Sequence, residues 1–131
     1  GSRFKFVPIC FLMQDLESSR EVGLAVAKAL QNKSALVIAS TDMTHYESQD
    51  AAQKKDKAVI EAALKLEEEK MYSTVEGLRV SMCGYGPAIA AVTASKELGA
   101  KNGKLLCYKT SGDVVHDYSA VVGYTSIMLS R

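Results

Sequence analysis

Two short stretches of the sequence carry side chains that can do chemistry. In the first, residues 41–46, the acid Asp42 and the histidine His45 lie three residues apart directly after an apolar run. A carboxylate at this spacing can orient an imidazole and fix its tautomer, which suits a general base or a metal site. Asp-x-x-His is a common spacing, however. The alternative is that Thr41 or Asp42 caps a turn while His45 packs.

The second stretch, residues 82–87, places Cys83 before a glycine turn and a predicted helix start. Backbone N–H groups and the positive end of the helix dipole favour the thiolate there, which is both the nucleophilic and the metal-ligating form of cysteine. The same position can hold a substrate anion. The alternative for a single cysteine is a small buried hydrophobe. That is the expectation for Cys10 and Cys107, which lie inside apolar strands.

A third polar stretch, residues 110–119, lies between two apolar runs near the end of the chain. Its hydroxyls and carboxylates can line a pocket, but a solvated connection between two strands explains the same composition. His116 and Asp117 are assigned to the surface.

The elements that must position these residues begin with a strand, a helix and a second strand. Residues 5–11 read as an apolar strand, Asp15 offers an N-cap for a helix to Leu30, and residues 35–39 form a continuously apolar strand. This order predicts a right-handed parallel crossover. It places residues 40–42 at the carboxyl end of a strand, where α/β sheets commonly bind ligands.

The rest of the chain continues the α/β pattern. Predicted elements are a helix over 53–69, a short helix around 71–75 ended by Gly77, a helix from Pro87 to Leu98 stopped by Gly99, and strands over 104–108 and 120–129. The acidic run at 67–70 is expected on the surface.

Composition favours one globular domain of 131 residues, with 47% hydrophobic and 24% charged residues. Sixteen basic and fifteen acidic residues are interspersed, which argues against nucleic acid as a partner, and no apolar run is long enough to span a membrane. Three cysteines without CxxC spacing favour a reducing, cytoplasmic location.

Gly1 and Ser2 are interpreted as a tag remnant. Residues 3–131 are expected to form a single domain that starts in mid-protein.

Four stretches, residues 37–46, 81–87, 108–113 and 121–124, resemble the Memo-like protein family in its own order and spacing. Members of that family are longer, so the resemblance implies that this chain is the C-terminal portion and that an N-terminal half is missing. The family is similar in fold to the class III extradiol dioxygenases. The implied architecture is therefore a half-domain of a three-layer α/β/α fold around a mainly parallel or mixed sheet.

The resemblance also implies a metal pocket. Two histidines would come from the missing N-terminal half, Cys83 would replace the carboxylate ligand of the dioxygenases, and Asp42 and His45 would line the pocket. The implied cofactor is iron, copper or zinc in the full-length protein, and a thiolate shifts the preference toward copper or zinc. Ring cleavage is therefore not simply inherited. The chain alone is predicted to bind metal weakly or not at all.

Three functions follow as alternatives. The first is a metal-dependent oxidoreductase of unknown substrate, with Cys83 as ligand, His45 as acid or base and Asp42 as its orienter. The second is a non-enzymatic metal-binding or interaction scaffold. The third is a hydrolase with Cys83 as nucleophile, His45 as base, Asp42 as its orienter and the amides after Gly84 as an oxyanion hole. Expected partners are the N-terminal half, a small-molecule substrate and a second copy of the chain.

Overall fold

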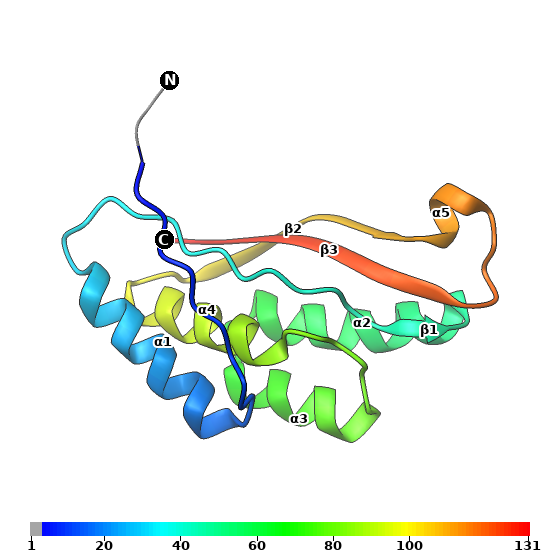
Figure 1. The fold of residues 1–131 in the computed structure, drawn as a ribbon, viewed down its shortest axis with the longest axis horizontal. Coiled ribbons are helices and arrows are strands. Elements are labelled where there is room, and N and C mark those ends of the chain that lie inside the picture. Colours follow the sequence, from blue (N-terminus) through cyan, green and yellow to red (C-terminus); the bar gives the residue numbers. More distant parts are fainter. Residues whose placement is uncertain (1–3) are drawn as a thin grey trace.

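The computed structural model describes residues 4–131 as an α/β fold, in which the longer helices lie on one side of a small sheet (Figure 1). The sheet has the strand order β1-β3-β2, with β1 at His45–Glu47, β2 at Asn102–Thr110 and β3 at Val121–Ser130. The predicted α/β class is confirmed. Both strand pairs of this sheet are antiparallel.

The helix α1, Leu16–Leu30, begins where the sequence predicts. The Asp15 carboxylate accepts a hydrogen bond from the Ser18 N–H at 2.9 Å, and this bond holds the pKa of Asp15 below its usual range. Gly23 then allows α1 to pack closely on α4, Tyr85–Glu97, since a β-carbon at Gly23 would lie 2.7 Å from the Ala90 carbonyl oxygen.

The two helices predicted over 53–69 and around 71–75 are α2 at Gln49–Leu64 and α3 at Glu68–Leu78, so the break between them lies earlier than predicted. Leu66 lies between them with a positive φ of 59°, which ends the first helix. The predicted stop at Gly77 falls one residue inside α3, and Arg79 with a φ of 49° ends that helix instead. The helix predicted from Pro87 is α4, and Gly99 follows it with a φ of 93° as expected.

The acidic run at 67–70 lies on the surface as predicted, except for Glu68. Glu68 is buried, and its carboxylate contacts the Lys96 ammonium at 3.0 Å and lies 3.9 Å from the Arg20 guanidinium. Burial alone would raise the pKa of Glu68, but hydrogen bonds from its own backbone and Lys96, together with both cations, hold that pKa below its usual value. Lys96 on α4 and Arg20 on α1 therefore stabilise the buried Glu68 carboxylate.

The predicted strands over 104–108 and 120–129 are confirmed as β2 and β3. They form one antiparallel hairpin, paired from Asn102↔Ser130 to Thr110↔Gly123 with a register shift between Leu105 and Cys107. The short helix α5, Gly112–Val115, lies in its connection. β1 pairs with the start of β3 through His45↔Val122. The core lies beneath this sheet among α2, α3 and α4, and includes Met43, Val59, Ile89 and Val92.

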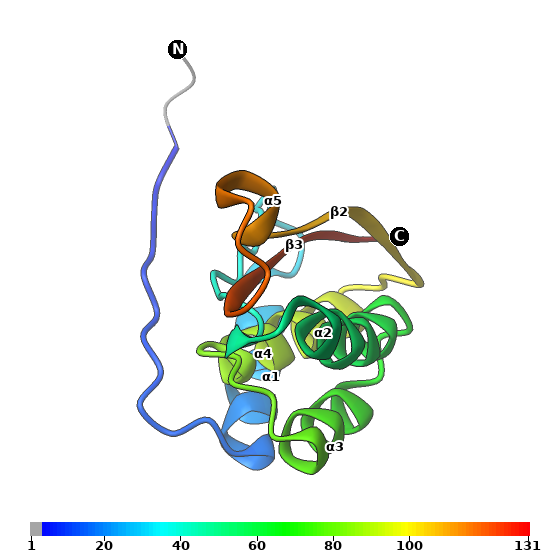
Figure 2. The ribbon, with the colours of Figure 1, turned by 90° about the vertical axis from the view of Figure 1, so that its right-hand side faces the viewer.

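The parallel crossover predicted from residues 5–11 and 35–39 is not formed. Both segments run without strand pairing, and Figure 2 shows residues 4–11 running apart from the sheet and helices. An apolar groove of about 390 Å³ lies between residues 36–39 and β3. A strand needs a neighbouring strand for its backbone groups, and neither segment has one among residues 4–131.

The same arrangement overturns the expectation that Cys10 and Cys107 are core residues, because both are exposed. Cys10 belongs to the unpaired segment. Cys107 lies on β2, where all four residues from Lys104 to Cys107 are exposed. Within residues 4–131, no helix combines the length and the apolar character that crossing a membrane requires.

Candidate metal centre

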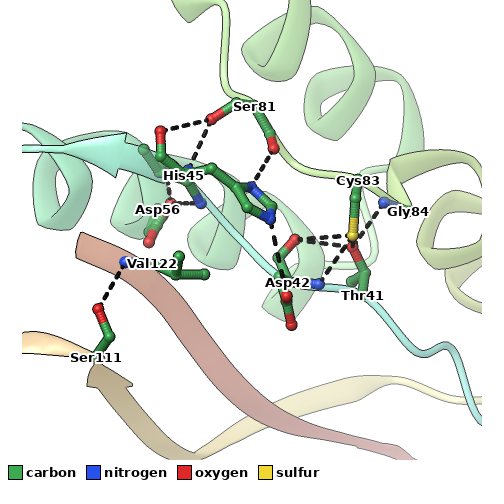
Figure 3. Close-up of polar contacts among 10 residues, drawn as sticks. Thr41, Asp42, His45, Asp56, Ser81, Cys83, Gly84, Ser111 and Val122 are labelled. Carbon is green, nitrogen blue, oxygen red and sulfur yellow. Dashed lines mark hydrogen bonds and ion pairs between the residues drawn. The ribbon is translucent and has the colours of Figure 1, made fainter. Parts of the chain in front are cut away.

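Three residues that the sequence singles out lie together in the structure (Figure 3). Asp42 lies just before β1, His45 is the first residue of β1, and Cys83 lies in the turn before α4. One ligand atom of each lies within 4.8 Å of the others. The fold therefore joins the two chemically active stretches of the sequence into one cluster.

The His45 ring is oriented by a backbone carbonyl. Its Nδ1 lies 2.6 Å from the Ser81 carbonyl oxygen, which can only accept, so Nδ1 carries the proton. In the neutral imidazole, Nε2 then presents a lone pair, and this atom lies 3.7 Å from the Asp42 carboxylate. Ser81 also accepts a hydrogen bond at 2.7 Å from the His45 N–H. The orienting bond predicted for Asp42 is thus made by Ser81, while Asp42 faces the other nitrogen.

The Cys83 sulfur lies beside the backbone of Asp42 and the hydroxyl of Thr41. The Asp42 N–H donates to Sγ at 3.3 Å, and the Thr41 hydroxyl oxygen lies 3.5 Å from the same atom. The thiolate, the form of cysteine that binds metal, can accept this N–H hydrogen bond. The segment that carries the acid therefore also supplies the cysteine with a backbone donor.

The turn at Gly84 holds Thr41 and Cys83 close together. The Gly84 N–H donates to the Thr41 hydroxyl at 2.8 Å, and that hydroxyl donates to the Asp42 carbonyl at 2.8 Å. A β-carbon at Gly84 would lie 2.8 Å from the Thr41 β-carbon and 3.0 Å from the Ser40 carbonyl oxygen. Only glycine permits this approach without a shift of the backbone.

Gln14 fixes the same turn from the other side and was missed by the sequence reasoning. Its amide donates to the Cys83 carbonyl at 3.1 Å and accepts from the Gly86 N–H at 2.9 Å. The two bonds cross about 70 residues of sequence, and no local spacing signals them. They also occupy the Gly86 N–H, which argues against an oxyanion hole built from the amides after Gly84.

The third polar stretch, residues 110–119, does not join the cluster. The Ser111 hydroxyl accepts from the Val122 N–H at 3.0 Å and so braces the hairpin (Figure 3). His116 and Asp117 are exposed, as predicted. Hydrogen bonds from the hydroxyl and N–H of Ser119 lower the pKa of Asp117, a local turn contact.

One separation within the cluster matches that of two ligands on a shared metal ion. Ligands bound at about 2.0–2.3 Å in a tetrahedral site lie roughly 3.3–3.8 Å from each other, and the His45–Asp42 separation of 3.7 Å falls in this range. A thiolate, an imidazole and a carboxylate together suit zinc, copper or iron. Cys83 is exposed and Asp42 half-exposed, so further ligands can reach the site.

The fold and the cluster define an α/β protein with a candidate cysteine-histidine-aspartate metal centre. A family model described as Memo-like protein matches residues 1–128, and the chain belongs to this family. A MEMO1 family protein of Methanococcus maripaludis strain C5 is 54% identical over 130 residues, which are 98% of this chain and 46% of that protein. The family resemblance stated from the sequence is confirmed.

Other relatives show the same coverage. A MEMO1 family protein of Methanocaldococcus jannaschii is 51% identical over 98% of this chain and 45% of its own length. One of Nitrosopumilus maritimus is 46% identical over 97% of this chain and 46% of its own length. The chain spans somewhat less than half the length of these relatives.

Proposed function

We propose that this chain supplies one side of a metal-binding pocket, with Cys83 as a metal ligand. The observation that carries the proposal is the convergence of Asp42, His45 and Cys83 within 4.8 Å. Two histidines from the other half of the longer family fold would complete the ligand set. A thiolate in that set favours zinc or copper over the iron of two-histidine, one-carboxylate sites.

In this proposal His45 and Asp42 handle protons beside the metal. The Nε2 lone pair of His45 points toward the cluster because Ser81 holds the proton on Nδ1, which gives the imidazole the form of a general base. In the whole protein this arrangement supports a metal-dependent oxidoreductase acting on a small molecule. The three free thiols make the reducing cytoplasm our proposed location.

Zinc titration against a chromophoric chelator tests the metal ligand. The chain joined to the N-terminal half of one of its relatives should bind zinc tightly, and the chain alone weakly. Cys83→Ser should weaken binding at least tenfold, and Cys107→Ser, which removes an exposed thiol on β2, is the matched control. Equal zinc affinity in wild type and Cys83→Ser would refute the proposal.

A scaffold without enzymatic activity is the second candidate, because the thiolate replaces the carboxylate on which dioxygen chemistry relies in related folds. Oxygen uptake with catechol-like compounds separates the two candidates. Turnover that depends on both metal and His45 favours the oxidoreductase. Tight metal binding without turnover favours the scaffold.

A further inference from the structure

Asp56 is a fully buried carboxylate on α2 that lies outside the cluster. Its relative exposure is 0%, and among the described residues no basic side chain pairs with it. Hydrogen bonds hold it instead. Its Oδ1 accepts from the Thr44 N–H at 3.0 Å and the Thr44 hydroxyl at 2.6 Å, and its Oδ2 accepts from the Tyr108 hydroxyl at 2.7 Å.

The Tyr108 hydroxyl is a stable donor in this network. Burial raises the pKa of Tyr108 far above its usual value, and the hydrogen bond to Asp56 raises it further. Tyr108 therefore stays protonated at neutral pH, and Asp56 receives three hydrogen bonds. A buried carboxylate is costly unless it is satisfied in this way, so the geometry around it is closely defined.

Thr44 is the residue through which Asp56 reaches the cluster, because it lies directly before His45 in the sequence. The Thr44 carbonyl accepts from the Gly123 N–H on β3 at 2.9 Å, and the Met43 N–H donates to the Gly123 carbonyl at 2.9 Å. On the side away from β3, Asp56 accepts hydrogen bonds from the N–H and the hydroxyl of Thr44. The residue is thus fixed between the sheet and α2.

The hydrogen bonds that hold Thr44 also determine where the side chains of Asp42 and His45 lie. Asp42 and His45 flank the held segment, and the His45 backbone continues directly to its bond with Ser81. A small rotation at Thr44 would move the His45 ring away from the Ser81 carbonyl and the Asp42 N–H away from the Cys83 sulfur. Both of those contacts prepare the cluster for a metal ion.

We propose that Asp56 is a positioning residue, which holds Thr44 so that His45 and Asp42 face Cys83. The inference rests on the proposed metal site, but it concerns the geometry of the site before any ion binds. Asp56 acts through hydrogen bonds and makes no contact with the metal-binding atoms. An asparagine, whose amide oxygen can accept both Thr44 donors, should therefore preserve much of the arrangement.

The test compares Asp56→Ala with Asp56→Asn, and uses Glu68→Ala as a control that removes another buried carboxylate, one paired with Lys96 and Arg20. Nitrogen-15 NMR of the imidazole rings reports the tautomer of His45 in the metal-free chain, and the chain has only two histidines to assign. Zinc affinity, measured with the N-terminal half joined, is the second readout. Thr44→Val, which loses only the hydroxyl donor, serves if Asp56→Ala fails to fold.

Wild type and Glu68→Ala should show His45 protonated on Nδ1. Asp56→Ala should show a mixture of tautomers and bind zinc about tenfold more weakly, as is typical of lost outer-shell contacts. Asp56→Asn should recover most of both signals, and Thr44→Val should lie between wild type and Asp56→Ala.

An unchanged His45 tautomer in both Asp56→Ala and Thr44→Val would overturn the inference. An equal change of the His45 tautomer in Glu68→Ala would overturn it as well. A failure of Asp56→Asn to recover the tautomer would also overturn it, because the carboxylate would then act by charge. Absence of zinc binding in the wild type would refute the metal site alone, since the tautomer is measured without metal.

Discussion

Replacing Gly123 by alanine places a methyl group against the buried carboxylate of Asp56. The added β-carbon would lie 3.2 Å from the Met43 β-carbon and in direct collision with Asp56 Oδ2. The carboxylate must move away, and its bonds to Thr44 and Tyr108 lengthen or break. Overpacking costs about 1–3 kcal/mol, and each buried polar group left unpaired costs about 1–3 kcal/mol more. We expect a loss of about 2–4 kcal/mol.

Urea unfolding followed by circular dichroism measures this loss directly. For a domain of this size, 1 kcal/mol shifts the melting temperature by roughly 3 °C, so Gly123→Ala should melt roughly 6–12 °C below wild type. Gly77→Ala is the matched control. Nothing lies within 4 Å of its added β-carbon inside α3, so it should stabilise the chain by about 0.5–1 kcal/mol. A Gly123→Ala variant as stable as wild type would show that Asp56 does not lie against β3.

Two further predictions concern contacts between distant elements. Gln14→Ala removes both bonds that bracket the turn at Cys83, so it should cost about 1–2 kcal/mol and speed hydrogen exchange of the Gly86 amide, and unchanged exchange would contradict the contact. Glu68→Gln tests the ion pair with Lys96. Because the folded pKa of Glu68 lies below 4.5, its contribution to stability is complete above that pH and is lost as pH falls through the lowered pKa. Wild type should therefore exceed Glu68→Gln in unfolding free energy at pH 7, and the difference should shrink on acidification in a urea series. A difference independent of pH would refute the assignment.

The predicted helices and the terminal hairpin depend on local information. Asp15 is an N-cap by residue type, Gly99 is a helix stop by its freedom to adopt positive φ, and the two final strands have apolar runs bounded by turn residues. Each signal lies within a few residues of the feature that it specifies. Prediction from one sequence therefore succeeds there.

Strand pairing depends on residues that the local pattern does not contain. Residues 5–11 and 35–39 have the composition of buried strands, but the parallel crossover also needs a neighbour for each of them, and the described structure pairs neither. A hydrophobic run indicates that a segment prefers burial. It does not indicate which surface of the protein will bury that segment.

The candidate site divides in the same way. Asp42, His45 and Cys83 could be selected from the sequence, because their side chains have distinctive chemistry and lie at the ends of predicted elements. Ser81, Gln14 and Asp56 could not. Ser81 acts largely through its carbonyl, Gln14 contacts a turn about 70 residues away, and Asp56 resembles the other acids on the polar face of α2. Such supporting contacts become visible only when the elements are packed.

The exposed apolar side chains at the start of the chain and along residues 36–38 have a thermodynamic consequence. The chain has an accessible surface of 8700 Å², whereas a folded monomer of 14.1 kDa has about 6700 Å² by size scaling. The excess, about 2000 Å², is as large as a stable protein–protein interface buries in total. Unfolding the isolated chain exposes correspondingly little new surface. Its urea m-value and heat-capacity increment should therefore fall below those of other domains of 131 residues, and both should rise once that surface is covered.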